Sequence, residues 1–164
     1  MRANEFDTDR KGRLLWTLRA ERSKNKRARV TPILGLALEI LTTYLDHAHN
    51  NDILFENEAG KPLYSGLIGQ QLRQRLDRLP IAKFSTHDLR RTVATMMTSQ
   101  LSLSLELVAA VVGHTTGGTQ TQTLVRHYVH DDFVDRKAIG LAQWDRRLRQ
   151  ILAGEAGKVV ALRA

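Results

Sequence analysis

The sequence contains no cysteine among its 164 residues. Disulfide cross-links, thiolate metal sites and cysteine nucleophiles are therefore excluded together, which fits a reducing compartment. The chain also lacks an apolar run of the roughly 18 residues that a membrane-spanning helix needs, and no signal-peptide pattern opens it. These absences predict a soluble, cytoplasmic protein without a membrane partner.

Motifs for metals and nucleotides are absent as well. There are six histidines, but His127 and His130 have no third ligand at an obvious spacing, and the chain has no His-Glu-x-x-His. Gly117 and Gly118 are not followed by the Gly-Lys-Ser/Thr of a phosphate-binding loop. The sequence therefore predicts no metal site and no nucleotide cofactor.

What the sequence has in excess is positive charge. It carries 25 basic and 17 acidic side chains, a net charge of +8, and its isoelectric point is about 10.3. Such a balance favours a polyanionic partner, and nucleic acid is the first candidate. The length and an apolar content of 42% suit one domain with its own core.

The hydrophobic periodicity predicts a mainly α-helical chain with a small antiparallel β-hairpin near the N-terminus. Apolar alternation over 14–20, a basic stretch and then "ARVTPI" indicate the hairpin. A brief edge strand is expected at 53–57. Helical spacing then predicts helices at 36–48, 68–79, from 86 onward, 104–112, 124–130 and 134–151.

The segment "STHDLRRT" concentrates one imidazole and two guanidinium groups at the start of a predicted helix. Ser85 and Asp88 stand at the spacing of a capping box, which satisfies free N–H groups of the first turn. At 100° per residue the helix separates an apolar arc from a cationic arc. The apolar arc holds Leu89, Val93, Met96 and Met97, and the cationic arc holds His87, Arg90 and Arg91.

Taken alone, this segment is more simply a solvated basic face, because charge clusters are common on helices. The same holds for the other polar candidates. His114 follows Gly113, a residue suited to the left-handed end of a helix, yet an isolated histidine is usually structural. Tyr128 by itself would be a core or rim aromatic, and Lys24 would be part of an ordinary charged turn.

Together, four motifs in order resemble the catalytic domain of tyrosine recombinases, the phage integrase family. "HDLRRT" resembles the family's His-x-x-Arg box, "VVGH" its Leu-Gly-His box and "RHYVH" its nucleophile segment. The strand pair in "WTLRAERSKNKRARVTPI" resembles the hairpin that carries the family's lysine. The resemblance covers 1–154, an incomplete catalytic domain of the DNA breaking-rejoining fold, and leaves 155–164 as a flexible tail.

This resemblance implies site-specific DNA recombination or integration without a cofactor. Tyr128 would attack the phosphodiester and form a 3′-phosphotyrosyl ester, which conserves the energy of the bond. Arg90 and His114 would stabilise the charge of the transition state, and His87 would assist proton transfer. Lys24 would protonate the leaving 5′ oxygen, with Lys26 as its rival. Contacts to double-stranded DNA are expected from Lys26, Arg27 and Arg91.

Two departures from the family pattern limit this expectation. The family's first catalytic arginine lies on a helix that precedes "MRANEFD", so the chain is expected to be N-terminally truncated and its activity impaired. The spacing from His114 to Tyr128 is also longer than usual. A non-catalytic DNA-binding remnant of a mobile element, or a basic RNA-associated protein, is the alternative, and self-association on DNA stays open.

Overall fold

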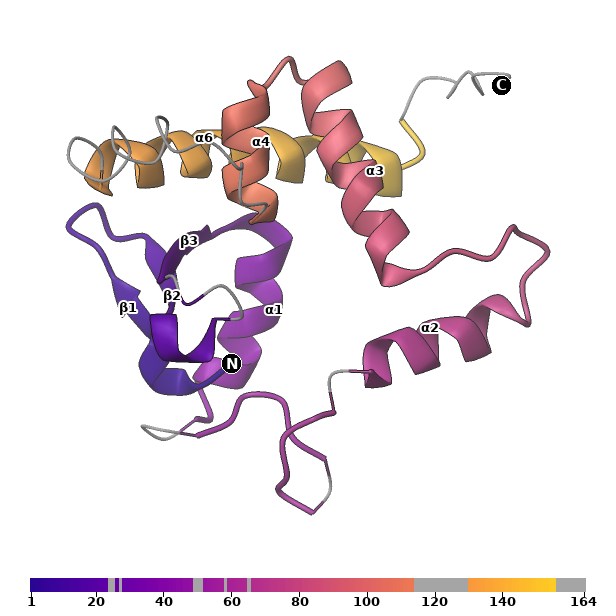
Figure 1. Cartoon of the computed structure of the whole chain (residues 1–164), viewed down its shortest axis with the longest axis horizontal. Coiled ribbons are helices and arrows are strands. Elements are labelled where there is room, and N and C mark those ends of the chain that lie inside the picture. Colours follow the sequence, from indigo (N-terminus) through magenta and orange to yellow (C-terminus); the bar gives the residue numbers. More distant parts are fainter. Residues whose placement is uncertain are drawn as a thin grey trace.

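A three-stranded antiparallel sheet and the helix that follows it form the N-terminal half of the fold. The computed structural model describes residues 1–23, 26, 28–48, 52–57, 59–64, 66–113 and 130–155 (Figure 1). The sheet has the order β1-β2-β3, and each neighbouring pair is antiparallel. Its bounds are Phe6–Thr8 for β1, Leu14–Leu18 for β2 and Arg29–Ile33 for β3.

The predicted hairpin is confirmed as β2 and β3, with Trp16 opposite Thr31 and Leu14 opposite Ile33. Strand β1 was missed because its three residues are too few to show an alternation. The strand expected at 53–57 is wrong. Of that stretch, Ile53 and Glu56 form only isolated bridges, the first with Arg2.

Five α-helices make up most of the rest of the described chain, so the mainly α class with a small sheet is confirmed. Helix α2 is shorter than expected, because it ends at Leu76 and leaves Leu79 outside it and 52% exposed. One short 3₁₀ turn precedes β1 and another follows β2. The helices are α1 Gly35–Leu45, α2 Leu67–Leu76, α3 Thr86–Ser99, α4 Leu105–Val112 and α6 His130–Leu152, and the turns are Ala3–Glu5 and Ala20–Arg22.

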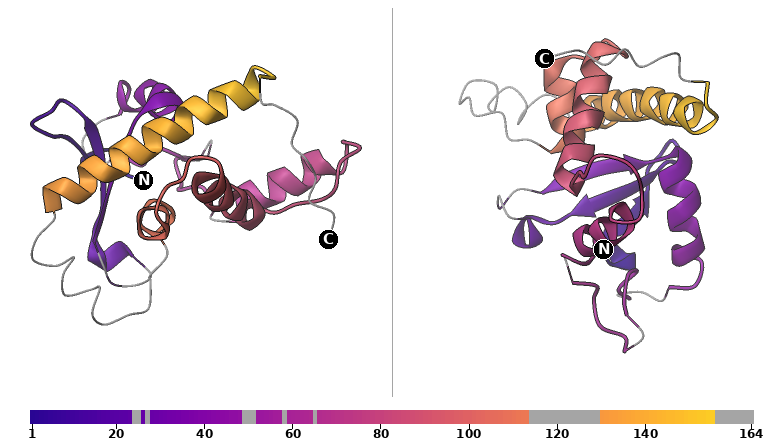
Figure 2. Two further views of the ribbon diagram at one scale, coloured as in Figure 1. Left: turned by 90° about the horizontal axis from the view of Figure 1, so that it is seen from above. Right: turned by 90° about the vertical axis from the view of Figure 1, so that its right-hand side faces the viewer.

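The elements pack in two groups that meet at β3. Ile33, Leu41 and Leu54 form one small core, where β3 and α1 enclose the segment after α1. Helix α6 crosses over the sheet and contacts β3 and α4 (Figure 2). Helix α4 in turn contacts α3, whose Met97 is fully buried. Burial of apolar side chains from α3, α4 and α6 thus holds the helical group together.

Helix α2 is set off from the rest of the fold in the view of Figure 1. Its contacts run to α3, and Leu76 is its buried residue, 4% exposed. Ile68 on the same helix is 69% exposed, although its spacing predicted a core position. Part of the apolar face of α2 is therefore left uncovered by the described chain.

Candidate functional site

The first turn of α3 is fixed by a capping box. The Ser85 hydroxyl accepts a hydrogen bond from the Asp88 N–H at 3.3 Å, and the Asp88 carboxylate accepts from the Ser85 N–H at 2.9 Å. Hydrogen bonds from Ser85 lower the pKa of Asp88, and the charges of Arg91 and His87 add to that shift. The predicted cap is confirmed, and it sets where the cationic side chains of α3 begin.

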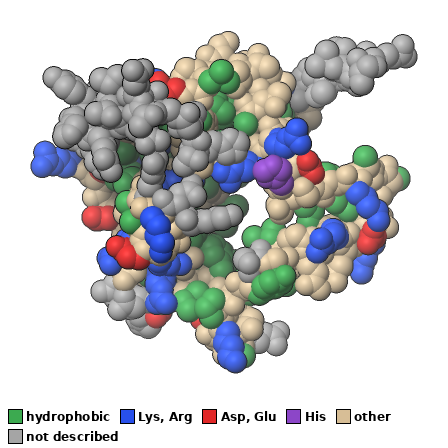
Figure 3. Space-filling model, viewed as in Figure 1, with side chains coloured by type: hydrophobic (Ala, Val, Ile, Leu, Met, Phe, Trp, Pro, Cys, Tyr) green, Lys and Arg blue, Asp and Glu red, His purple; other side chains and the backbone are tan. Residues whose placement is uncertain are grey.

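His87 and Arg91 are exposed on α3. The neighbouring Arg90 reaches from α3 to the end of α4, where its Nη2 donates to the carbonyl of Val112. Figure 3 shows the histidine and basic side chains gathered where α3 begins. The prediction that the apolar arc is buried is confirmed for Met97. It is wrong for Leu89, which is 47% exposed.

Helix α4 ends as predicted, with Gly113 in the left-handed region at φ 71°. A residue with a Cβ is strained there, so glycine suits this position. Val111 and Val112 belong to the last turn, whose carbonyls have no partner within the helix and carry the negative end of the helix dipole. Arg90 therefore satisfies one of these carbonyls, that of Val112, two positions before His114 in the chain.

A second guanidinium, Arg29 at the start of β3, meets the same turn. Its Nη2 donates to the Val111 carbonyl at 2.6 Å, across 82 residues of sequence. Burial lowers the pKa of Arg29, and the positive charge of Arg90 lowers it further. Sequence reasoning missed Arg29, although period-two alternation places it on the same face of β3 as the buried Ile33.

Lys137 is a third cation near this turn, and we call Arg29, Arg90 and Lys137 together the cationic seam. Sequence reasoning also missed Lys137, because it lies inside the apolar stripe of the last helix. It is 8% exposed, and its Nζ donates to the carbonyl of Val30 at 2.8 Å. Burial lowers its pKa to about 8, and the charge of Arg29 contributes. Among the described side chains, no carboxylate forms an ion pair with Arg29, Arg90 or Lys137.

Four of the predicted site residues, Lys24, Arg27, His114 and Tyr128, lie outside the described residues. Lys26 is exposed in the connection between β2 and β3, with φ 52°. The structure thus brings Arg90 to the turn that leads into His114. It also brings to that turn the strand that follows the predicted lysines in the sequence. The assembly of the full set stays a prediction.

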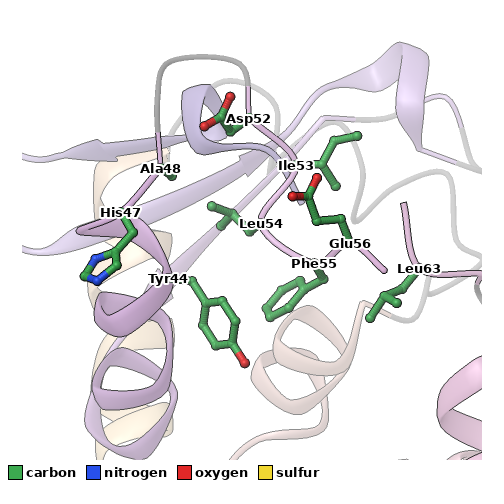
Figure 4. A pocket seen from close by; sticks show the side chains of 9 residues that line it. All are labelled: Tyr44, His47, Ala48, Asp52, Ile53, Leu54, Phe55, Glu56 and Leu63. Carbon is green, nitrogen blue, oxygen red and sulfur yellow. The ribbon is translucent and has the colours of Figure 1, made fainter. Parts of the chain in front are cut away.

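A pocket of about 470 Å³ lies elsewhere, between α1 and the segment after it (Figure 4). The ring centroids of Tyr44 and Phe55, which both line it, lie 5.1 Å apart. Asp52 and Glu56 line it together with His47, and none of the predicted site residues does. Two carboxylates in its lining disfavour a phosphate ligand, so this pocket does not compete with the cationic seam.

In the described part of the chain, no group of three histidine or acidic side chains has the geometry to hold a metal ion. Within the same residues, none of the helices combines the length and apolar character that crossing a bilayer requires.

Comparisons with known proteins agree with the motifs. The model of the phage integrase family matches residues 1–134. The tyrosine recombinase XerC of Chlamydia trachomatis serovar L2 is 27% identical over 131 residues, 76% of this chain and 39% of that protein. XerC of Roseiflexus sp. is 31% identical over 114 residues, 63% of this chain and 36% of that protein. No solved structure matches significantly. The chain spans about two fifths of the length of these curated relatives.

Proposed function

Because the chain belongs to the phage integrase family, we propose that it cuts and rejoins double-stranded DNA in site-specific recombination, with Tyr128 as the nucleophile. The family match covers residues 1–134 and so includes every predicted catalytic position. The similarity to XerC recombinases supports the same reaction class. A net charge of +8 suits a DNA backbone as the partner.

In the proposed reaction the Tyr128 hydroxyl attacks a backbone phosphorus. A tyrosyl–phosphate bond forms at the 3′ end while the bond from phosphorus to the 5′ oxygen breaks. His87 assists removal of the phenol proton, and Lys24 or Lys26 gives a proton to the departing 5′ oxygen. Arg90 and His114 stabilise the charge on the non-bridging oxygens. The ester keeps the bond energy for rejoining, so neither ATP nor a metal ion is expected.

The position of Arg90 is the observation that carries this proposal. Its guanidinium is fixed by one donor to the Val112 carbonyl, which leaves its other N–H groups for a phosphate. The carbonyl belongs to the turn that precedes His114, and no described carboxylate pairs with Arg90 to neutralise it. Held this way, a guanidinium is oriented for an anion before the anion arrives.

The test is covalent trapping on a nicked duplex that cannot be rejoined. We expect the chain to form a protein–DNA adduct and Tyr128→Phe to form none. The exposed Tyr64 gives a matched control, since Tyr64→Phe should leave the adduct unchanged. Arg90→Ala should lower the rate of adduct formation by roughly 10²–10³-fold, the usual cost of one transition-state donor.

The alternatives give different results in this assay. Salt-sensitive duplex binding without any adduct would contradict catalysis and identify a DNA-binding module. Tighter binding to structured RNA than to duplex, unaffected by changes at His87 or Arg90, would contradict both DNA functions. Several other expectations stay predictions. They are self-association on DNA, a prokaryotic cytoplasmic location, an origin in a mobile element, DNA contacts by Arg27 and Arg91, and the boundary after Gly154.

A further inference from the structure

Two arginines from different elements converge on the last turn of α4. Arg90 comes from α3 and donates to Val112, and Arg29 comes from β3 and donates to Val111 at 2.6 Å. The two are not equivalent in their exposure. Arg90 is exposed, whereas the Nε of Arg29 is buried without a hydrogen-bond partner. Arg29 therefore faces the protein rather than a ligand in solvent.

The close approach of Arg29 to Gly113 shows how tightly this turn is held. A Cβ built on Gly113 would overlap the Nη1 atom of Arg29. The left-handed glycine, φ 71°, thus has two functions, since it ends the helix and makes room for the guanidinium. Partial negative charge on the terminal carbonyls gives a physical reason for a cation to lie there.

Val30, the next residue of β3, binds helix α6 inside its length, after its start at His130. The Val30 carbonyl accepts a hydrogen bond from Lys137 of α6 at 2.8 Å. Residues 114–129 join α4 to α6, and they include His114 and Tyr128. Adjacent residues of β3 therefore bind the helix before this connection and the helix after it.

We propose that Arg29 is a positioning residue that fixes the end of α4, and with it the entry to the segment that carries His114 and Tyr128. It acts through the Val111 carbonyl and through contact with Gly113, and it does not contact the DNA. The local effect on α4 is independent of the proposed function, whereas the effect on cleavage rests on it.

Hydrogen–deuterium exchange of the full chain tests the local effect. In Arg29→Met we expect the amides at the end of α4, residues 109–113, to exchange about tenfold faster, because a charge-assisted hydrogen bond is lost. Amides of α3 and of the second half of α6 should keep their protection. Arg147→Met is the control, since Arg147 bonds Gln100 on the surface and not α4.

Two variants keep the test decisive if Arg29→Met does not fold. Arg29→Lys retains the charge but not the fork, so it should loosen the same amides by a smaller factor. Gly113→Ala should displace the guanidinium from the other side and also strain the left-handed turn, so it should loosen residues 109–113 at least as much as Arg29→Lys does. Unchanged exchange at 109–113 in Arg29→Met, or in Arg29→Lys should Arg29→Met not fold, would overturn the proposal.

Duplex binding and trapping separate positioning from DNA contact. For Arg29→Met we expect adduct formation to slow by about tenfold or more while the Kd for duplex changes less than about threefold. Arg29→Lys should restore part of the rate. If Arg29→Met instead weakens duplex binding, and the salt dependence of its Kd falls by about one phosphate contact, then Arg29 is a DNA ligand and the proposal is overturned. If the unmodified chain forms no adduct, the proposed function fails, while the exchange result still decides the role of Arg29.

Discussion

Glu5 and Lys137 are the two charged residues that the described structure buries, and their surroundings are opposite in kind. Glu5 is 5% exposed, and its carboxylate accepts from Trp16 Nε1 at 3.2 Å, from the Arg2 N–H at 3.1 Å and from Arg22. Lys137 is 8% exposed, and its partners are the Val30 carbonyl and the ring of Phe133, whose centroid lies 5.4 Å from the Lys137 Nζ.

A buried charge stabilises a fold only when its partners replace the water that it has lost. Glu5 has an opposite charge and two further donors, which together satisfy its oxygens. No described carboxylate pairs with Lys137, and the charge that acts on its pKa is that of Arg29, which has the same sign. We therefore expect Glu5 to stabilise the packing around Trp16 and Lys137 to weaken the packing between β3 and α6.

The largest effect should come from removing the satisfied charge. Glu5→Ala leaves the Trp16 N–H without its acceptor and opens a cavity, so the free energy of unfolding should fall by roughly 2–4 kcal/mol. Urea denaturation followed by tryptophan fluorescence measures this change. A loss below about 1 kcal/mol would mean that Glu5 is no better placed than Lys137.

The pH dependence of stability should show Lys137 directly. Its folded pKa of about 8 lies below the ordinary lysine value of 10.5, so between these pH values the unfolded chain holds more protons than the folded one. The contribution of Lys137 to the unfolding free energy should therefore rise from pH 8 to pH 10.5, by roughly 2–3 kcal/mol. The measurement is the difference between the unchanged chain and Lys137→Met across that range, which cancels the other titrating groups. A constant difference would contradict the lowered pKa.

Removing the unsatisfied charge should raise stability. Lys137→Met keeps most of the buried stem and abolishes the cost of desolvation, but it loses the hydrogen bond to Val30. At pH 7 we expect a net gain of about 1–2 kcal/mol in the free energy of unfolding. Urea denaturation at pH 7 checks the sign, and a loss of stability would show that the bond to the Val30 carbonyl outweighs the desolvation.

The smallest effect should come from the exposed partner of Glu5. The Arg22 side chain is 44% exposed, so Arg22→Met breaks an ion pair that solvent already screens. The expected loss is about 0.5–1 kcal/mol, well below that of Glu5→Ala. Equal losses in the two variants would place the stabilisation in the ion pair rather than in the bonds from Trp16 and Arg2.

Prediction from the sequence succeeded where the decisive contacts are short in range. The Ser85–Asp88 cap and the Gly113 helix end are set by neighbours three or four positions apart, and both are confirmed. It failed where burial depends on a distant element. Leu89 and Leu79 have core spacing and yet are exposed, because no described segment covers them.

The candidate site divides in the same way. The order of the motifs identified the family and the role expected of Arg90, but Arg29 and Lys137 remained hidden. Their contacts join residues 82 and 107 positions apart, and periodicity carries no information over such distances.

Local backbone preferences and side-chain types were enough to predict the hairpin, most of the described helices, the Ser85 cap, the Gly113 helix end and the order of the family motifs. The meeting of Arg29 and Arg90 at the end of α4, with Lys137 buried near Arg29, depends instead on how distant elements pack. The packing of α6 against both β3 and α4 brings these cations together, against their mutual repulsion. Local preference alone does not specify such a placement.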